Sequence, residues 1–306
     1  MEELLRAVER ALPGVALRRD EPMARHTTFR IGGPIAGMLF PRSEAELAEA
    51  FARLRTLGVK PLLVGRGSNL LVTDAPLKCI AVKTCPDVAE VRLTGDTTLR
   101  AACGTPLAAL ASFALAEGLT GLEFAHGIPG SLGGAVYMNA GAYGGEMKNA
   151  VRNVSAMTSD GVLREYSGGA LEFSYRHSVF TGTDTLILAA ELTLARGERG
   201  EIEQTMRDYA ARRAKSQPLA YPSAGSAFKR PPGGYAAAMI DEAGLRGYAV
   251  GGAQVSERHA GFIVNRGGAT FEDVTRLLAH VREVVYARTG VTLEPEIKII
   301  KSGEDA

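Results

Sequence analysis

The stretch that decides the fold is GLEFAHGIPGSLGGAVYMNAGAYGG, residues 121–145, in which eight of the twenty-five positions are glycine. Its glycines stand among small and apolar residues, not among the Ser, Asp and Pro of a flexible linker, and this predicts packed loops. Because glycine lets backbone amides come close to a phosphate, a nucleotide-cofactor site is one interpretation. A tightly packed turn region without a ligand is the other.

Hydrophobic spacing, capping residues and turn residues predict an α+β chain. The expected helices lie near 4–12, 43–58, 105–118, 200–215, 235–243 and 270–290. The expected strands lie near 35–40 and 61–64, within 79–103 as three mostly antiparallel strands, and near 151–159, 162–167, 185–195 and 292–300. Ser43, with Glu46 three residues on, and Thr270 are the predicted N-caps of two of these helices.

A second glycine loop, GRGSN at residues 65–69, follows a predicted strand. It would lie at the carboxyl end of that strand, where open α/β sheets bind ligands. Neither this loop nor GIPGSLGG at 127–134 has the context of a P-loop or of a Rossmann fingerprint. Ser68, Asn69 and Ser131 could together offer polar groups to a pyrophosphate, so a nucleotide with one diphosphate and a planar ring would suit the two loops.

Composition excludes several classes of function. The 306 residues are 46% hydrophobic and 23% charged, with a formal net charge of +1, which is typical of a globular protein and disfavours nucleic-acid binding. The three cysteines form no CxxC pair and the five histidines no ligand spacing, so no metal site is expected. No apolar run approaches the roughly 20 residues that span a bilayer, and residues 1–10 are not typical of a signal peptide. We therefore expect no membrane insertion and a cytoplasmic location.

Four polar residues are candidates for a site, and each has an ordinary alternative. Arg176 is either a solvated charge or a planar donor to a carboxylate or phosphate. Ser226, in SAGSAFK, either faces a ligand or bonds its own turn, and the absence of an Asp/His relay disfavours hydrolase chemistry. Glu296 lies on the same side of an extended chain as Glu294, where a strand-end surface charge is the ordinary reading. His259 is by default a structural histidine.

Six motifs occur in the order found in the UDP-N-acetylenolpyruvoylglucosamine reductase family, the flavoenzymes of peptidoglycan precursor synthesis. The chain resembles this family from about residue 20 to 300, and it resembles the shorter subtype, since no tyrosine-bearing insertion separates the Arg176 region from SAGS. Arg66 departs from the family pattern, which often has a small or acidic residue there. The motifs are HTTFRIGGP (26–34), VGRGSNLLV (64–72), GIPGSLGGAVYMNAGAYGG (127–145), FSYRHSVF (173–180), QPLAYPSAGSAFKRP (217–231) and LEPEI (293–297).

The resemblance implies an α+β fold with a two-lobed FAD-binding domain of the vanillyl-alcohol-oxidase type and a C-terminal α+β substrate-binding domain. Lobe 1 would comprise residues 1–78 and lobe 2 residues 79–211. The substrate-binding domain would comprise residues 212–293, and 294–306 is a candidate for returning to lobe 1.

The same resemblance assigns roles to individual residues. The catalytic residues would be Arg176, Ser226 and Glu296. The FAD-binding residues would be Gly65, Arg66, Gly67, Ser68, Asn69, Leu70, Gly127, Ile128, Pro129, Gly130, Ser131, Gly134 and Gly141. The substrate-binding residues would be Tyr175, Arg213, Gln217, Lys229 and His259.

The implied reaction uses NADPH to reduce bound FAD, which passes a hydride to C3 of the enolpyruvyl ether of UDP-N-acetylglucosamine enolpyruvate, while Ser226 protonates C2. The partner is thus a small UDP-sugar. Another FAD-dependent oxidase or dehydrogenase of the same cofactor fold is one alternative, and a non-catalytic nucleotide-binding protein is another. Neither alternative requires SAGSAFK and LEPEI together with Arg176.

Overall fold

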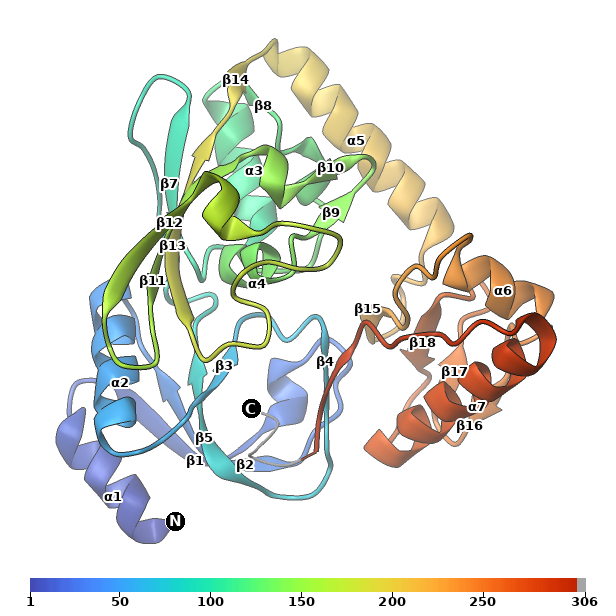
Figure 1. The fold of residues 1–306 in the computed structure, drawn as a ribbon, viewed down its shortest axis with the longest axis horizontal. Coiled ribbons are helices and arrows are strands. Elements are labelled where there is room, and N and C mark those ends of the chain that lie inside the picture. Colours follow the sequence, from blue (N-terminus) through green and yellow to red (C-terminus); the bar gives the residue numbers. More distant parts are fainter. Residues whose placement is uncertain (302–306) are drawn as a thin grey trace. The chain divides into compact units, whose positions relative to one another are not determined.

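The computed structural model describes residues 1–301, and its chain forms two compact units (Figure 1). Unit 1 comprises residues 1–19, 37–66 and 80–213, and unit 2 comprises residues 20–36, 67–79 and those from 214 on. Residues 302–306, the end of the segment 294–306 considered above, lie outside the described residues. This two-way division does not test the three-part division expected from sequence, which stays a prediction.

Helices and runs of strands are interspersed along the chain. The helices are α1 (Glu2–Ala11), α2 (Glu44–Thr56), α3 (Leu107–Ala116), α4 (Leu132–Tyr137), α5 (Arg199–Ser216), α6 (Ala236–Glu242) and α7 (Phe271–Thr289). The strands are β1 (Ala16–Pro22), β2 (Pro34–Phe40), β3 (Leu62–Val64), β4 (Leu70–Val72), β5 (Leu77–Lys83), β6 (Val91–Leu93), β7 (Thr98–Ala102), β8 (Leu119–Thr120), β9 (Gly141–Ala142), β10 (Gly145–Glu146), β11 (Val151–Met157), β12 (Leu163–Ser167), β13 (Leu186–Thr193), β14 (Ala195–Arg196), β15 (Ser223–Ser226), β16 (Ala249–Val250), β17 (Ala253–Val255), β18 (Phe262–Asn265) and β19 (Lys298–Ile300).

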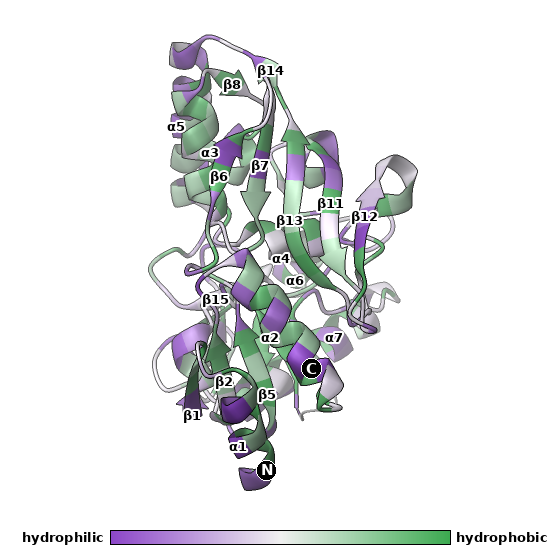
Figure 2. Ribbon diagram, turned by 90° about the vertical axis from the view of Figure 1, so that its left-hand side faces the viewer, coloured by the Kyte–Doolittle hydropathy of each residue, from purple (hydrophilic) through white to green (hydrophobic). Residues whose placement is uncertain are grey.

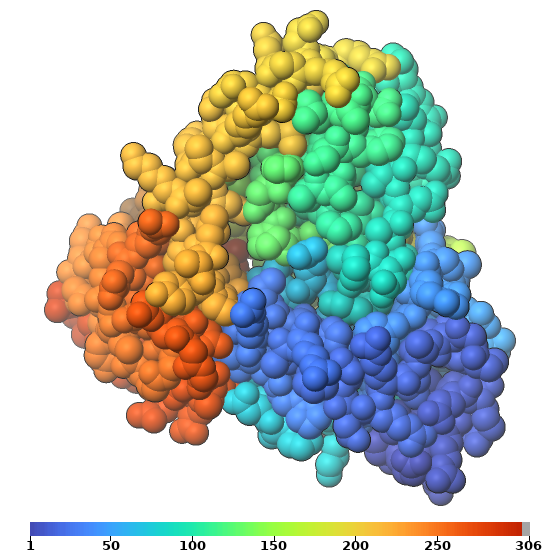
Figure 3. All heavy atoms as spheres, turned by 180° about the vertical axis from the view of Figure 1, so that it is seen from behind, coloured from blue at the N-terminus to red at the C-terminus, as the bar shows by residue number. Residues whose placement is uncertain are grey.

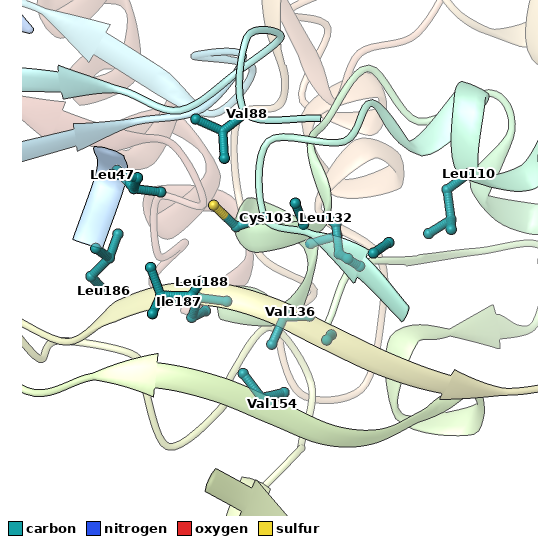
Figure 4. Close-up of a cluster of buried hydrophobic side chains, with 14 of the residues drawn as sticks. Leu47, Val88, Cys103, Leu110, Leu132, Val136, Val154, Leu186, Ile187 and Leu188 are labelled. Atoms are coloured by element: carbon teal, nitrogen blue, oxygen red, sulfur yellow. The ribbon is translucent and has the colours of Figure 1, made fainter. Parts of the chain in front are cut away.

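Unit 1 is built on an antiparallel sheet with the strand order β12-β11-β13-β7-β6, and β11, β12 and β13 lie side by side in Figure 1. The first five residues of β13 are all buried, because both faces of this central strand are covered. Figure 4 shows side chains from β13, α4 and α3 meeting around Cys103 in one apolar cluster. The glycine-rich stretch is therefore anchored through α4 to the main core of this unit.

A second sheet, with the order β1-β2-β5-β3, sets the position of the GRGSN loop. Strands β3 and β5 pair in parallel, with Val64 opposite Lys83, whereas β6 and β7, the other two strands of 79–103, pair antiparallel as expected. Six of the seven residues of β5 are buried, and Figure 2 colours most of this strand as hydrophobic. Because β3 and β5 are parallel, their carboxyl ends lie at the same end of the sheet. The GRGSN loop begins there with Gly65.

Unit 2 has its own apolar cluster and an antiparallel sheet with the order β15-β18-β17-β16. Helix α7 begins at the predicted cap, where Thr270 Oγ1 accepts from Asp273 N and the Asp273 carboxylate accepts in turn from Thr270 N. Of the strand expected at 292–300, only β19 forms a regular strand, and it pairs in parallel with β4. Within residues 1–301, no helix is both long and apolar enough to cross a bilayer.

Candidate functional site

The two glycine loops meet in unit 1 at Gly65 and Ser131. A Cβ placed on Gly65 would lie 2.5 Å from Ser131 Oγ, well inside ordinary van der Waals contact. Only glycine therefore fits at position 65 while Ser131 keeps its rotamer. The structure thus brings together two loops that sequence reasoning could only treat as separate candidates.

The turn at 127–131 is fixed by backbone bonds to the start of α3. Leu107 N donates to Gly130 O over 3.0 Å, and Leu132 N donates to Thr105 O over 2.9 Å. Ser131 then begins α4, a short helix that sequence patterns did not reveal, but its side chain makes no capping bond. Ser131 is only 2% exposed, and its hydroxyl points toward Gly65 instead.

Arg213, near the end of α5, packs on the same turn. Its guanidinium donates to Gly127 O, and a Cβ on Gly127 would lie 3.3 Å from Arg213 Cδ. Arg213 Nε is buried and has no hydrogen-bond partner among the residues that the structure describes. Figure 3 shows the gold atoms of α5 lying along the green glycine-rich region. A buried donor left unpaired beside the two loops is what an anionic group would satisfy.

These residues fit the diphosphate of a dinucleotide such as FAD. Gly65 lets Ser131 Oγ come close to the first loop, and Gly127 lets the Arg213 side chain come close to the second, so each glycine makes room for a polar side chain. Gly134 lies on α4, and its Cβ position is 3.7 Å from Ser131 Oγ. The roles of the individual residues in holding the cofactor stay predictions.

The rest of the GRGSN loop, from Gly67 on, belongs to unit 2. Thr28 N donates to Gly67 O over 3.2 Å, which ties the loop to the HTTFRIGGP segment. Asn69 Nδ2 donates to Glu296 O over 3.0 Å, and Lys298 N donates to Asn69 O over 2.9 Å. Two predicted site residues from opposite ends of the sequence, Asn69 and Glu296, are therefore held together in this unit.

Arg176 stands at the tip of a tight hairpin in unit 1. Ser174 and His177 exchange two backbone bonds of 3.1 and 3.2 Å, and Arg176 itself has φ +55°. This left-handed conformation costs a residue with a side chain about 1 kcal/mol, so the surrounding structure must impose it. The guanidinium carbon lies 5.1 Å from the ring centre of Tyr175, which is half exposed.

Two polar anchors join this hairpin to the glycine-rich stretch. Asn139 Nδ2 donates to Ser174 O over 2.9 Å, and Asn139 Oδ1 accepts from Lys148 N. Ser178, fully buried, donates to Tyr137 O over 2.8 Å. Sequence reasoning gave neither Asn139 nor Ser178 a role. The sequence feature that could have identified them is a polar residue inside an otherwise apolar or glycine-rich run: Asn139 in NAG and Ser178 in HSV.

In unit 2, Ser226 and Glu296 are brought next to each other. Ser226 ends β15 opposite Phe262, and Glu296 N donates to the carbonyl of Ala227, the next residue, over 2.9 Å. Strand β15 was not among the strands expected from sequence. The two residues therefore share one corner of unit 2, whereas Arg176 belongs to unit 1.

The predicted substrate residues of unit 2 have mixed surroundings. Lys229 forms an ion pair with Glu294, and its backbone N donates to Glu294 O over 2.9 Å. His259 Nδ1 accepts from Gly261 N over 3.1 Å, and burial lowers the pKa of His259, which favours the neutral ring. Gln217 follows the end of α5, with its carbonyl accepting from Leu219 N.

The predicted residues are thus divided between the two units. Unit 1 holds Gly65, Arg66, Gly127, Ile128, Pro129, Gly130, Ser131, Gly134, Gly141, Tyr175, Arg176 and Arg213. Unit 2 holds Gly67, Ser68, Asn69, Leu70, Gln217, Ser226, Lys229, His259 and Glu296.

Lys83 is the residue that sequence reasoning missed beside the first loop. Its ammonium donates to Gly65 O, and the residue is only 8% exposed. Burial lowers the pKa of Lys83 to about 8. The available signal was its place at the end of an apolar strand, CIAVK, parallel to the strand that precedes GRGSN.

Comparison with known families agrees with this arrangement. Residues 35–167 match the model of an FAD binding domain, and residues 217–300 match that of the UDP-N-acetylenolpyruvoylglucosamine reductase C-terminal domain. The predicted α+β fold class and the FAD cofactor are therefore confirmed.

Whole-chain relatives carry the same name. A UDP-N-acetylenolpyruvoylglucosamine reductase of Heliobacterium modesticaldum is 47% identical, over 92% of this chain and 90% of its own length. One of Caldanaerobacter subterraneus is 46% identical, over 92% of each chain. The crystal structure of the reductase from Thermus caldophilus matches with a TM-score of 0.79 at 34% identity, over 94% of this chain and 98% of its own. The chain therefore belongs to the UDP-N-acetylenolpyruvoylglucosamine reductase family and is an FAD-dependent oxidoreductase.

Proposed function

We propose that this chain reduces UDP-N-acetylglucosamine enolpyruvate to UDP-N-acetylmuramate, with NADPH as electron donor, as a step of peptidoglycan precursor synthesis in the cytoplasm. Beyond family membership, one observation carries the proposal. The backbone bond from Glu296 N to Ala227 O places the predicted acid Ser226 and the predicted carboxylate Glu296 in the same corner of unit 2. A protein that only binds the cofactor has no need for that pairing.

FAD, when bound, would relay a hydride from NADPH to C3 of the enolpyruvyl ether. Negative charge then accumulates on the substrate carboxylate, so donors fixed there stabilise the transition state more than the ground state. Arg176 suits this role, because its planar fork can donate two parallel bonds to a carboxylate. Its φ of +55° and the bond from Asn139 to Ser174 support a side chain that is positioned before substrate arrives.

Ser226 would deliver the proton that completes the reduction at C2. An alcohol is a weak acid in water, but a carbanionic carbon is a far stronger base, so the transfer is downhill. The serine would regain its proton from solvent. Glu296 would act at the same carboxylate, either as a protonated carboxyl or by orienting the arginine, because an unpaired negative charge there would repel the dianion.

The UDP group of the substrate requires cations and hydrogen-bond donors. Lys229, Gln217 and His259 of unit 2 would supply them, with Lys229 exchanging its Glu294 partner for a phosphate oxygen. Tyr175 would lie beside the reacting end. Arg213 would contribute from the loop at Gly127, where its guanidinium already donates to a carbonyl.

The test is a turnover assay without oxygen, so that oxidase chemistry is excluded. The FAD-loaded protein should consume NADPH beyond the amount that reduces its flavin only when UDP-N-acetylglucosamine enolpyruvate is present, and mass spectrometry should show a product that has gained two hydrogens. Ser226→Ala should abolish this product. Ser223→Ala, on the same strand, should leave it unchanged. NADPH consumption that ignores the sugar nucleotide would contradict the proposal.

A further inference from the structure

Lys83 is a buried cation at the point where the first glycine loop begins. It ends β5 opposite Val64 of β3, and its ammonium donates to the carbonyl of Gly65, the residue that follows Val64. Only 8% of the residue is exposed. Lysine is rarely buried to this extent without a counter-charge, because removing an ammonium from water costs several kcal/mol.

The groups around Lys83 do not neutralise it. The charged or titratable neighbours are Cys85 and Asp87, which favour the ammonium, and Arg66, which opposes it. Among residues 1–301, the one carboxylate that acts appreciably on Lys83 is Asp87, which does so through space and more weakly than burial. The pKa of Lys83 is lowered to about 8, chiefly by burial, so the ammonium persists at neutral pH without an ionic partner.

The bond to Gly65 also fixes a donor on the other side of the same peptide. In a planar trans peptide the C=O and N–H groups point in opposite directions. Because the Gly65 carbonyl points to Lys83, the N–H of Arg66 points away from it. An ammonium bound to the carbonyl polarises this peptide and makes its N–H a stronger donor to an anion.

We propose that Lys83 is a positioning residue for the cofactor diphosphate. It orients the Gly65–Arg66 peptide, and the bound diphosphate, not a protein carboxylate, balances its charge. This inference rests on the assignment of the loop at Gly65 to FAD in the proposed function. In the FAD-free protein the buried ammonium is held by the Gly65 carbonyl alone, and the bound diphosphate would add the anion that it lacks.

The test is the affinity of the FAD-free protein for FAD and for riboflavin, which lacks the diphosphate, measured by flavin fluorescence. Lys83→Met removes charge and donor, and Lys83→Gln keeps a donor but removes the charge. Losing a charge-assisted bond should weaken FAD binding by about tenfold to a hundredfold in both variants. Riboflavin binding should change by less than about twofold. Lys78→Met, an exposed lysine on the same strand, is the matched control and should behave as the wild type.

The pH dependence gives a second measurement. A diphosphate held at the Gly65–Arg66 peptide raises the pKa of the nearby ammonium through space, so the FAD affinity of the wild type should be highest below pH 8 and should fall above it, as Lys83 of the FAD-free protein loses its proton. Lys83→Gln should show no such fall.

Each contrary result has a distinct meaning. FAD affinities of both variants within about twofold of the wild type would overturn the inference. Equal losses for FAD and riboflavin, or FAD-free variants that do not fold, would show that Lys83 serves the fold and would overturn it as well. A wild-type protein that binds no FAD would instead contradict the proposed function.

Discussion

Gly65→Ala tests whether the two glycine loops are packed against each other as the structure has them. The new methyl group would lie 2.5 Å from Ser131 Oγ, roughly 1 Å short of ordinary contact. Gly65 is not among the residues with positive φ, so alanine meets no backbone penalty there. The clash with this one atom is therefore the dominant effect, and overpacking of this size costs about 1–3 kcal/mol.

The second substitution that isolates this contact is Ser131→Ala. The next nearest atom to the new methyl is Ser131 Cβ at 3.7 Å, which is ordinary contact, so removing Oγ should relieve the clash. Ser131 makes no side-chain cap to α4, and Ser131→Ala alone should therefore change stability by less than about 0.5 kcal/mol. The double variant should recover about 1–2 kcal/mol relative to the sum of the two single changes.

The assay is urea unfolding of the FAD-free protein, followed by FAD titration of each variant. Gly14→Ala is the control, because no atom lies within 4 Å of its Cβ position. The double variant should regain stability but not FAD affinity, since it lacks the Ser131 hydroxyl. A Gly65→Ala protein as stable as the wild type, or a double variant no more stable than Gly65→Ala, would refute the packing of these loops.

Three further predictions concern the chemistry. Ser226→Ala should leave flavin reduction by NADPH intact while slowing flavin reoxidation by substrate about 10²- to 10⁴-fold in rapid-mixing experiments, and equal loss of both half-reactions would exclude Ser226 as proton donor. Arg176→Lys should lower turnover more than the FAD content measured by absorbance, since the planar fork is lost; release of FAD would indicate a structural role. The difference in stability between the FAD-free wild type and Lys83→Met should change by about 3 kcal/mol in favour of the wild type from pH 8 to about 10.5, because over this range the unfolded lysine keeps a proton that folded Lys83 has released. The buried thiols of Cys79, Cys85 and Cys103, whose pKa values are raised by burial, affect both proteins alike. Parallel pH profiles of the two proteins in urea unfolding would contradict the buried charge.

Local signals in the sequence were sufficient for much of the fold. Ser43 caps α2, its side chain accepting from Glu46 N over 3.1 Å, and Gly290 ends α7 with φ +70°, both as expected. Such signals are reliable because the bonds join residues three or four positions apart. The helix expected near 105–118 is α3, with Pro106 as its N-cap.

The predictions that failed concern elements whose structure depends on contacts with segments distant in sequence. The strand expected at 292–300 is reduced to β19, because Glu294 and Glu296 bond singly to the Ser226 loop and Pro295 has no N–H to extend a ladder. The parallel pairing of β5 with β3 depends on which neighbour completes the sheet, and periodicity does not report this.

The candidate site shows the same division. The motifs around Gly65, Arg176 and Ser226 could be found from sequence because they resemble those of a known family. Lys83 could not, since its importance comes from burial against Gly65 across two strands. The same holds for the unpaired Nε of Arg213, which only the packing of α5 on Gly127 reveals.

The central claim is that this chain passes electrons from NADPH through FAD to an enolpyruvyl sugar nucleotide, and the most direct measurement is a two-step anaerobic titration followed by flavin absorbance. NADPH should bleach the bound flavin, and UDP-N-acetylglucosamine enolpyruvate, added next without oxygen, should restore its yellow absorbance in stoichiometric proportion. A flavin that stays bleached after the sugar nucleotide is added, and recovers only when air is admitted, would contradict the account.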